Sequence, residues 1–279
     1  MTPIGDGTGD PARILRDLFD AAVASAQPDV CVPPNLPDPP RGRTVVVGVG
    51  KAAAKMARAV EAYYPAPVGG VIVCPYGAAL PLRYIRVIEA AHPIADANSV
   101  RGAAAICDAV SGLTADDLVI ALISGGGSAL AALPVDGVTL AEKQEAVAAL
   151  MRAGAPIREL NALRAALSRF KGGGLLRALP PARCVSLIIS DVVGDDPAVI
   201  ASGPTVPAAP DPAAVLASLE RHGVRAAPAV AAHLRAVAAH AGPVPAGSAD
   251  NRLIATPGMA LAASAARARA VGLEPRILG

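Results

Sequence analysis

The sequence predicts an α/β fold with a doubly wound, mostly parallel, Rossmann-like sheet and helices on both faces. Short apolar runs of strand length alternate with helical segments, an order typical of parallel strands joined by crossover helices. The first of these runs ends in a glycine-rich turn. The chain has 279 residues, of which 53% are hydrophobic, so it carries ample apolar side chain for a core.

The elements begin with a helix predicted over residues 11–26, with Asp10 as its N-cap and Pro11 at its first position. The proline-rich stretch 27–43 is expected to hold no regular structure, because proline lacks a backbone donor and interrupts helices and strands. A helix over about 51–63 follows the first strand. The predicted strands are residues 44–50, 69–74, 84–90, 116–124 and 184–190.

Two later helices carry clear end signals. Thr139 and Glu142 form a capping box that begins one helix, and Gly154 is placed to end it. Asp211, followed by proline, begins another helix that Gly223 ends.

The last part of the chain follows a turn-rich stretch and forms a further strand-helix-strand unit. Its predicted elements are a strand at 252–256, a helix over about 257–271 and a strand at 275–278. We therefore divide the chain into an α/β domain of residues 8–245 and an incomplete segment of residues 246–279. A parallel strand at the very end of the sequence suggests a second domain that is missing or only begun.

Composition excludes several classes of function. The net charge is only +2 and aromatic residues make up 2%, so neither a nucleic-acid surface nor a polyanion surface is expected. No apolar run approaches the roughly 20 residues of a membrane span, and the N-terminus has no signal-peptide pattern. Four scattered cysteines without metal-ligand spacing favour a reducing compartment, so we expect a cytoplasmic protein; a homodimer stays open.

The first candidate site is a glycine turn that carries one of the four lysines among 25 basic residues. Lys51 follows Gly48 and Gly50, a loose match to the dinucleotide-binding turn, but no acidic residue follows the next strand to hold a ribose hydroxyl. The spacing does not fit a Walker loop either. The turn can still be interpreted as an anion-binding site at a helix N-terminus. The alternative interpretation is a tight turn whose lysine is solvated and binds nothing.

The second candidate site is a run of three glycines between two serines, directly after the strand at 116–124. Its residues are Ser124, Gly125, Gly126, Gly127 and Ser128. Glycines let the backbone approach a ligand closely, and the flanking hydroxyls add donors, so we interpret this loop as a phosphate cradle. A merely flexible turn is the alternative.

The third candidate site is a polar stripe on a helix predicted over 157–174. At about 100° per residue, its members fall on one side of that helix beside an apolar face. They are Asn161, Arg164, Ser168 and Lys171. The stripe could line a cleft for an anionic or polyhydroxyl substrate, or form the solvated edge of an ordinary helix.

The fourth candidate site is the acidic turn after the strand at 184–190. Asp191 and Asp195 supply hard oxygen ligands suited to Mg²⁺, although aspartate is also common in turns. Ser190 precedes them and joins the expected binding set. His92, at the end of another strand, is either a polar substrate contact or a loop residue.

Together these stretches resemble the glycerate 2-kinase family, which is unrelated in its motifs to P-loop kinases. The matching segments, in consistent order along the chain, are VGVGKAAAKMA, EAAHPIAD, ISGGGSALAALP, LNALRAALSRFKGGGLL and LIISDVVGDDPAVIASGPTVP. The resemblance implies ATP-dependent phosphorylation of a glycerate hydroxyl, in a cleft between an α/β domain and a smaller C-terminal domain. It also implies that Lys51 is the catalytic lysine.

The chemistry of the remaining residues suggests their roles beside that lysine. The loop 124–128 would hold carboxylate or phosphate, and Asp191 and Asp195 would position Mg²⁺. Arg164 and Lys171 would bind anionic groups, with Arg164 placed beside Lys51 in the catalytic set.

The sequence departs from the family pattern in two ways. Ala95 replaces the second proline of an HPxPD-like stretch, and the family's glycine-rich C-terminal domain, with its active-site arginine, is not in this sequence. We therefore expect weak or no kinase activity from this chain alone. Two other functions stay open: a hydroxypyruvate reductase, and an inactive fragment that retains a ligand-binding or partner-binding domain.

Overall fold

The sheet of the protein is six-stranded and entirely parallel. The computed structural model describes residues 10–179, 181–207, 211–239 and 247–278. The strands are β1 (Thr44–Val49), β2 (Gly69–Pro75), β3 (Ile85–Ala90), β4 (Leu118–Ile123), β5 (Arg183–Ile189) and β6 (Ala249–Ala255). Their order in the sheet is β3-β2-β1-β4-β5-β6, so the predicted doubly wound fold is confirmed.

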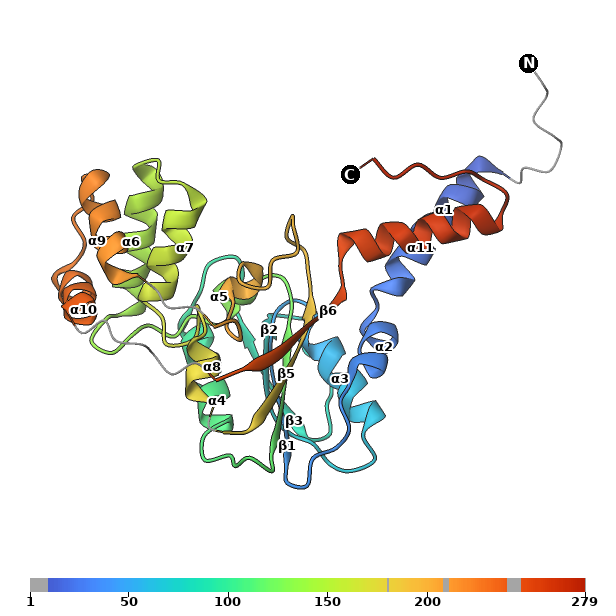
Figure 1. Cartoon of the computed structure of the whole chain (residues 1–279), viewed down its shortest axis with the longest axis horizontal. Helices are drawn as coiled ribbons and strands as arrows, with labels where there is room; N and C mark the ends of the chain where they lie inside the picture. The colour runs from blue at the N-terminus through green and yellow to red at the C-terminus, as the bar shows by residue number, and fades with distance from the viewer. Residues whose placement is uncertain (1–9, 180, 208–210, 240–246, 279) are drawn as a thin grey trace, which may run out of the picture.

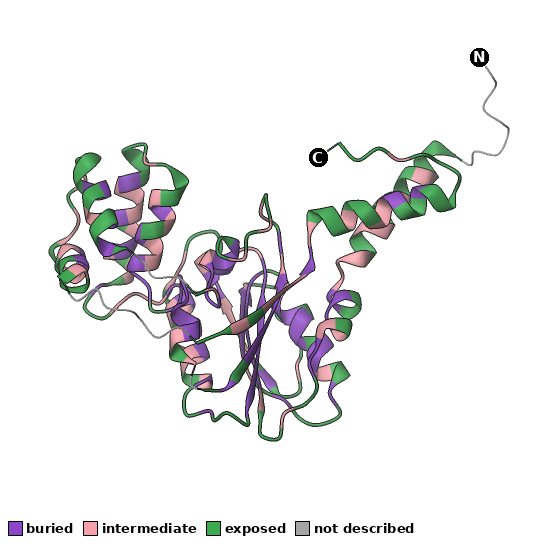
Figure 2. Cartoon of the chain, in the orientation of Figure 1, coloured by how far each residue is buried: buried purple, intermediate pink, exposed green. Residues whose placement is uncertain are grey.

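Helices cover both faces of this sheet (Figures 1 and 2). One apolar cluster packs α3 (Ala53–Tyr63) against one face, through side chains such as Met56 and Ile72. A second cluster packs α4 (Ala97–Ala109) and the short helices α5 (Gly127–Leu130) and α8 (Gly174–Ala178) against the other. All strands run the same way, so the loops after β1, β3, β4 and β5 gather at one edge.

The proline-rich connector is more regular than the sequence analysis expected. Helix α1 (Pro11–Ser25) begins with Asp10 as N-cap, as predicted, but two short helices follow it inside the connector. They are α2 (Pro28–Cys31) and the 3₁₀-helix η1 (Pro33–Asn35). Both begin with proline, whose fixed φ suits the first turn of a helix, so a proline-rich composition did not exclude helix here.

Four helices form a separate cluster beside the sheet, drawn at the left of Figure 1, which we call the helical lobe. They are α6 (Leu140–Arg152), α7 (Ile157–Ala166), α9 (Pro212–Arg221) and α10 (Pro228–Ala239). Their apolar faces make a third core around Leu150, Leu163 and Leu219. The predicted capping box of Thr139 with Glu142 is confirmed.

The helix predicted over 157–174 is wrong beyond α7, which ends at Ala166. The Ser168 hydroxyl accepts hydrogen bonds from the N–H groups of Phe170 and Lys171, a local turn that competes with helical bonding. Gly172 and Gly173 then take left-handed backbone angles. The polar stripe proposed along one helix therefore does not continue to Ser168 and Lys171.

The C-terminal segment contributes β6 to the sheet and then α11 (Pro257–Ala270), which packs along α1 as a two-helix arm (Figure 1). The strand predicted at 275–278 is wrong: this stretch is irregular and lines a shallow pocket together with residues of α1 and α11. The proposed domain boundary at 245/246 lies outside the described residues. Within the described ranges, no helix is long and apolar enough to cross a bilayer.

We predict that Gly48→Ala destabilises the fold. Gly48 lies inside β1, and a Cβ there would lie 2.9 Å from the Leu122 Cβ and 3.0 Å from the Ile72 Cγ2. Such overpacking should cost about 1–3 kcal/mol of unfolding free energy, measured by urea denaturation. Gly69→Ala, whose Cβ would meet nothing within 4 Å, is the control, and equal loss in both variants would contradict this view.

Candidate active site

The candidate site lies where the loops after β1 and β4 meet. These strands are neighbours at the point where the winding of the sheet reverses, the place where doubly wound folds bind ligands. The two loops are tied together: Lys51 N–H donates to the Gly125 carbonyl at 2.9 Å, and Ala52 N–H donates to the Ser124 hydroxyl at 3.0 Å. The first loop is therefore fixed by the second.

This bonding changes the interpretation of the Gly50–Lys51 turn. The N–H of Gly50 donates to a carbonyl of β2, and that of Ala53 donates back to Gly50. With the amides of Lys51 and Ala52 also occupied, residues 50–53 have no backbone donor to offer an anion. The group that this turn offers a ligand is the Lys51 side chain.

The Lys51 side chain extends from this turn toward the acidic turn after β5. Its Nζ lies 3.5 Å from the Asp191 Oδ2, and both side chains are about half exposed. A Cβ on Gly125 would overlap the Asp191 carboxylate, and one on Gly126 would lie 3.2 Å from the Lys51 Cε and 3.0 Å from the His92 ring. The structure thus brings together residues from the loops after β1, β3, β4 and β5.

The triple-glycine loop carries the donors that the first loop lacks. In the described part of the chain, the amides of Gly125 and Gly126 have no hydrogen-bond acceptor. Gly126 has φ of +84°, a left-handed conformation that favours glycine. A hydrogen bond of 2.6 Å between the hydroxyls of Ser128 and Ser202 anchors the loop.

A strained turn supports both this loop and Lys171. Ala201 and Ser202, in the 3₁₀-helix η2 (Ile200–Ser202), have φ of +51° and +63°, which non-glycine residues rarely adopt. The N–H of Gly172 donates to the Ser202 carbonyl at 2.8 Å, and the turn after Lys171 is thereby fixed. Backbone strain maintained by its surroundings is common at functional sites.

A pocket of about 370 Å³ opens between the triple-glycine loop and the helical lobe. Arg164 and Lys171, both predicted site residues, line it together with His92, Gly126 and Ser128. Its other walls are Pro93, Ile94, Ala95, Ala129, Ala132, Leu140, Lys143, Gln144, Val147, Ala148 and Met151. The lining contains three cationic side chains and no carboxylate.

Sequence reasoning missed Lys143, the third of these cations. It lies on α6, is 4% exposed, and its Nζ donates to the Leu167 carbonyl at 2.9 Å. No motif marks it, but the rarity of lysine in this chain was a signal that applied to Lys143 as much as to Lys51 and Lys171.

Burial lowers the pKa values of the two lysines in the pocket. Burial, and then the nearby Arg164 charge, lower the pKa of Lys171 to about 8. Burial, followed by repulsion from Lys171 and Arg164, lowers the pKa of Lys143 well below its ordinary value. Burial also lowers the pKa of Arg164, whose Nη1 donates to the Asn161 Oδ1 at 3.0 Å.

The acidic turn holds one carboxylate oxygen without a partner. The Asp195 Oδ1 is buried and has no hydrogen bond within the described ranges, and its backbone φ is +51°. Asp191 lies nearby in sequence and faces Lys51. Among the described residues, no three His, Cys, Asp or Glu side chains form a metal-binding group, so a cation here would need further ligands from water or substrate.

The remaining predicted site residues lie in the scaffold. Gly48 is inside β1, and Ser124 is 2% exposed, with its hydroxyl accepting the Ala52 N–H. Ser190 is buried, and its hydroxyl accepts from the Val192 N–H. These locations suggest that the three residues hold the loops in position.

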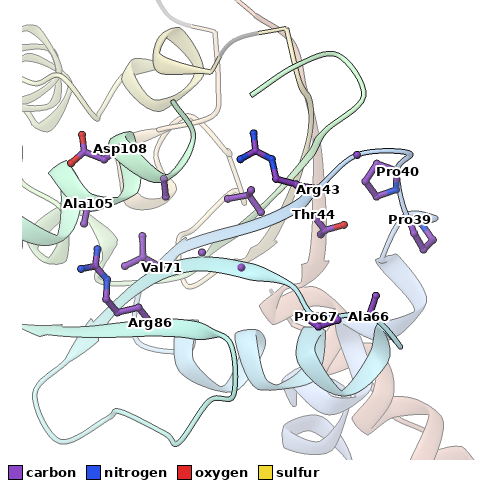
Figure 3. Close-up of a pocket in the computed structure, with 15 residues that line it drawn as sticks. Pro39, Pro40, Arg43, Thr44, Ala66, Pro67, Val71, Arg86, Ala105 and Asp108 are labelled. Carbon is purple, nitrogen blue, oxygen red and sulfur yellow. The ribbon is translucent and has the colours of Figure 1, made fainter. Parts of the chain in front are cut away.

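A larger cavity, of about 780 Å³, lies at the opposite end of the sheet (Figure 3). Its walls come from the start of β1 and β2 and from α4, with Arg43, Arg86 and Asp108 around it. The Arg43 guanidinium already pairs with Asp117 at 3.3 Å. Because ligands of doubly wound folds bind at the carboxyl ends of the strands, we do not place the active site here.

A family model described as a domain of unknown function, DUF4147, matches residues 14–235. The chain belongs to this family. Its relatives include a protein of Agrobacterium vitis with the provisional name hydroxypyruvate reductase, 48% identical over 96% of this chain and 61% of its own length. The human glycerate kinase is 39% identical over 96% of this chain and 57% of its own.

The fold of this DUF4147 protein is also found in a solved glycerate kinase. The crystal structure of the Thermotoga maritima glycerate kinase superposes with a TM-score of 0.86 at 32% identity, over 93% of this chain and 62% of the other. The resemblance to the glycerate kinase family is therefore confirmed. The chain spans about three fifths of the length of these relatives.

We predict that Ser124→Ala loosens the junction of the two loops. The Ala52 amide would lose its acceptor, so its hydrogen exchange should accelerate and the unfolding free energy should fall by about 1 kcal/mol or more. Ser128→Ala, which removes only the bond to Ser202, should leave exchange at Ala52 unchanged. An unchanged Ala52 amide in Ser124→Ala would contradict the assigned bond.

We predict that Lys171 makes stability rise with pH. Its native pKa of about 8 lies below the unfolded value of 10.5, so between these values the unfolded state binds more protons and unfolding becomes less favourable as pH rises. The stability of the wild type minus that of Lys171→Met should therefore increase from pH 7.5 to 9.5 in urea titrations. A constant or falling difference would contradict the buried, depressed lysine.

Proposed function

We propose that the site supports ATP-dependent phosphorylation of a hydroxyl of D-glycerate. The observation that carries the proposal is the meeting of Lys51, Asp191 and the triple-glycine loop beside a cationic pocket without carboxylates. Phosphoryl transfer needs mainly positioning and neutralisation of charge, which ammonium groups, guanidinium groups and backbone amides supply. Membership of a family that includes glycerate kinases supports the same substrate.

The site residues would have different roles, according to their charge and their exposure. The half-exposed Lys51 would stabilise negative charge on the transferring phosphoryl group, and the free amides of Gly125 and Gly126 would donate hydrogen bonds to its oxygens. Arg164 on α7 and Lys171 on the turn that follows α7 would hold the anionic part of the acceptor. In the reaction, the acceptor hydroxyl oxygen forms a bond to the γ-phosphorus and loses its proton to water, while the bond from the γ-phosphorus to the leaving ADP oxygen breaks.

The acidic turn fits a magnesium ion brought with the nucleotide. Its unpartnered, buried Asp195 oxygen and the half-exposed Asp191 offer hard oxygen ligands, and Mg²⁺ commonly completes its shell with water and phosphate oxygens. Mg²⁺ bound here would neutralise phosphate charge. Asp191 would then orient both that ion and the Lys51 ammonium.

Reduction of hydroxypyruvate is the second candidate, suggested by the name of the Agrobacterium vitis relative. Two observations count against a dinucleotide cofactor at the first loop: the amides of residues 50–53 are occupied, and β2 ends in Cys74 and Pro75 without an acidic residue. An NADH-oxidation assay with hydroxypyruvate distinguishes the two reactions.

A third candidate is a domain that binds ligands without turnover, since the chain spans only part of its relatives' length. It predicts that Mg·ATP raises the melting temperature while glycerate phosphorylation stays at background.

All four cysteines are free, which suits a reducing compartment, so we propose the cytoplasm as the location. We also propose that the protein forms a homodimer.

We predict that Lys51→Ala, in a form of the protein that also carries the C-terminal domain expected from the family resemblance, reduces phosphoryl transfer from ATP to D-glycerate by about 100-fold or more. This is the usual cost of losing one transition-state donor. The melting temperature should stay near that of the wild type, because the side chain is half exposed. Lys55→Ala, an exposed lysine one turn further along α3, is the matched control. Near-normal turnover in Lys51→Ala would overturn the assigned role.

A further inference from the structure

We propose that Lys143 completes a small-anion subsite with Arg164 and Lys171, and that this subsite takes the carboxylate of a short hydroxy acid. The proposal deepens the function argued above and rests on it for the identity of the acid. It assigns the anion to the acceptor and gives a role to a lysine that no motif marks.

The three cations reach one pocket from different elements. Lys143 comes from the first turn of α6, Arg164 from the last turn of α7, and Lys171 from the turn that follows. Lys143 and Lys171 are each only 4% exposed. Such convergence of buried side chains does not follow from helix amphipathicity, which directs charged side chains toward solvent.

None of the three cations has a carboxylate partner in the part of the chain that the structure describes. They take part in no ion pair found in the described residues, and no acidic residue lines their pocket. In the same part of the chain the Lys171 Nζ has no hydrogen-bond acceptor, and the Lys143 Nζ uses one donor, toward Leu167. Burial of ammonium groups without compensation is costly, so the arrangement is explained by a ligand that supplies the negative charge.

The position of the pocket identifies which end of a substrate it would hold. Its rim includes Gly126, and a Cβ at Gly126 would lie 3.2 Å from the Lys51 Cε, so the pocket opens beside the transfer point. At about 370 Å³ it is near the small end of ligand pockets, and its other wall is apolar, with Leu140 and Val147. A short acid fits with its carboxylate toward the cations and its hydroxyl toward Lys51.

Anion binding at this subsite should be coupled to proton uptake. The groups that face Lys143 are Lys171 and Arg164, with His92 across the pocket; from α10, His233 bonds the Ala166 carbonyl. Since burial and mutual repulsion disfavour the charged lysines, an anion between them favours protonation. Protons should therefore be taken up on binding, and the affinity for the acid should fall as pH rises above about 8.

The test is calorimetric titration of the whole chain with D-glycerate, inorganic phosphate and Mg·ATP, in buffers of different ionisation enthalpy. In Lys143→Met, D-glycerate should bind about 10-fold or more weakly and with less proton uptake, while binding of Mg·ATP stays unchanged. The melting temperature should not fall, because the substitution replaces a buried charge with an apolar chain of similar length. Arg152→Met, an exposed position on the same helix, is the control.

Several outcomes would overturn the subsite. They are undetectable binding of D-glycerate by the wild type, unchanged affinity and proton uptake in Lys143→Met, or loss of Mg·ATP binding together with glycerate binding. Weaker binding of phosphate with unchanged binding of D-glycerate would mean that the subsite takes a phosphate and would overturn the carboxylate assignment. If Lys143→Met weakens glycerate binding but Lys51→Ala retains turnover, the subsite stands and the assigned catalytic lysine fails.

If Lys143→Met does not fold, Lys171→Met provides the second test. Lys171 donates no side-chain hydrogen bond within the described ranges, so its removal leaves no acceptor unpaired. The same loss of glycerate affinity and proton uptake is expected. Unchanged values in this variant would contradict the subsite.

Discussion

The bond from the Ala52 N–H to the Ser124 hydroxyl, with its neighbour from Lys51 to the Gly125 carbonyl, determines what the site can offer. These bonds join the loops after two adjacent strands and occupy the amides of Lys51 and Ala52, directly before α3. In many doubly wound folds those amides receive a phosphate. Here they are used inside the protein, so the Lys51 side chain and the glycine loop become the groups available to a ligand.

The turn that carries Lys171 is tied to the same edge of the sheet by a second set of hydrogen bonds. The turn after Lys171 bonds to the left-handed Ser202, and the Ser202 hydroxyl also bonds that of Ser128 in the glycine loop. One strained turn thus fixes the position of a pocket cation relative to the loop at the sheet. A substitution at Ser202 would be expected to disturb both sides of the pocket, although neither of its neighbours lies close to it in sequence.

Sequence patterns predicted the strands and most helix ends because these depend on local signals: apolar runs, the Asp10 and Thr139 caps, and glycines such as Gly154. The sequence patterns failed where tertiary contacts determine the local structure. The helix through Lys171 stopped early because Ser168 bonds the backbone, and the short helices in the connector form against α3. Lys143 was missed because its helix looks ordinary, and only the packing of the lobe turns this side chain into the pocket.

The cations of the site differ in a way that the chemistry can use. Lys51 is half exposed and has Asp191 as a counterion before any substrate binds. Lys143 and Lys171 are buried with no counterion among the described residues, so their charged forms are disfavoured until an anion fills the pocket. The full positive field around the acceptor is therefore completed when an anion binds. An anion that could not reach both lysines would leave that field incomplete, which provides a physical basis for selecting a short acid.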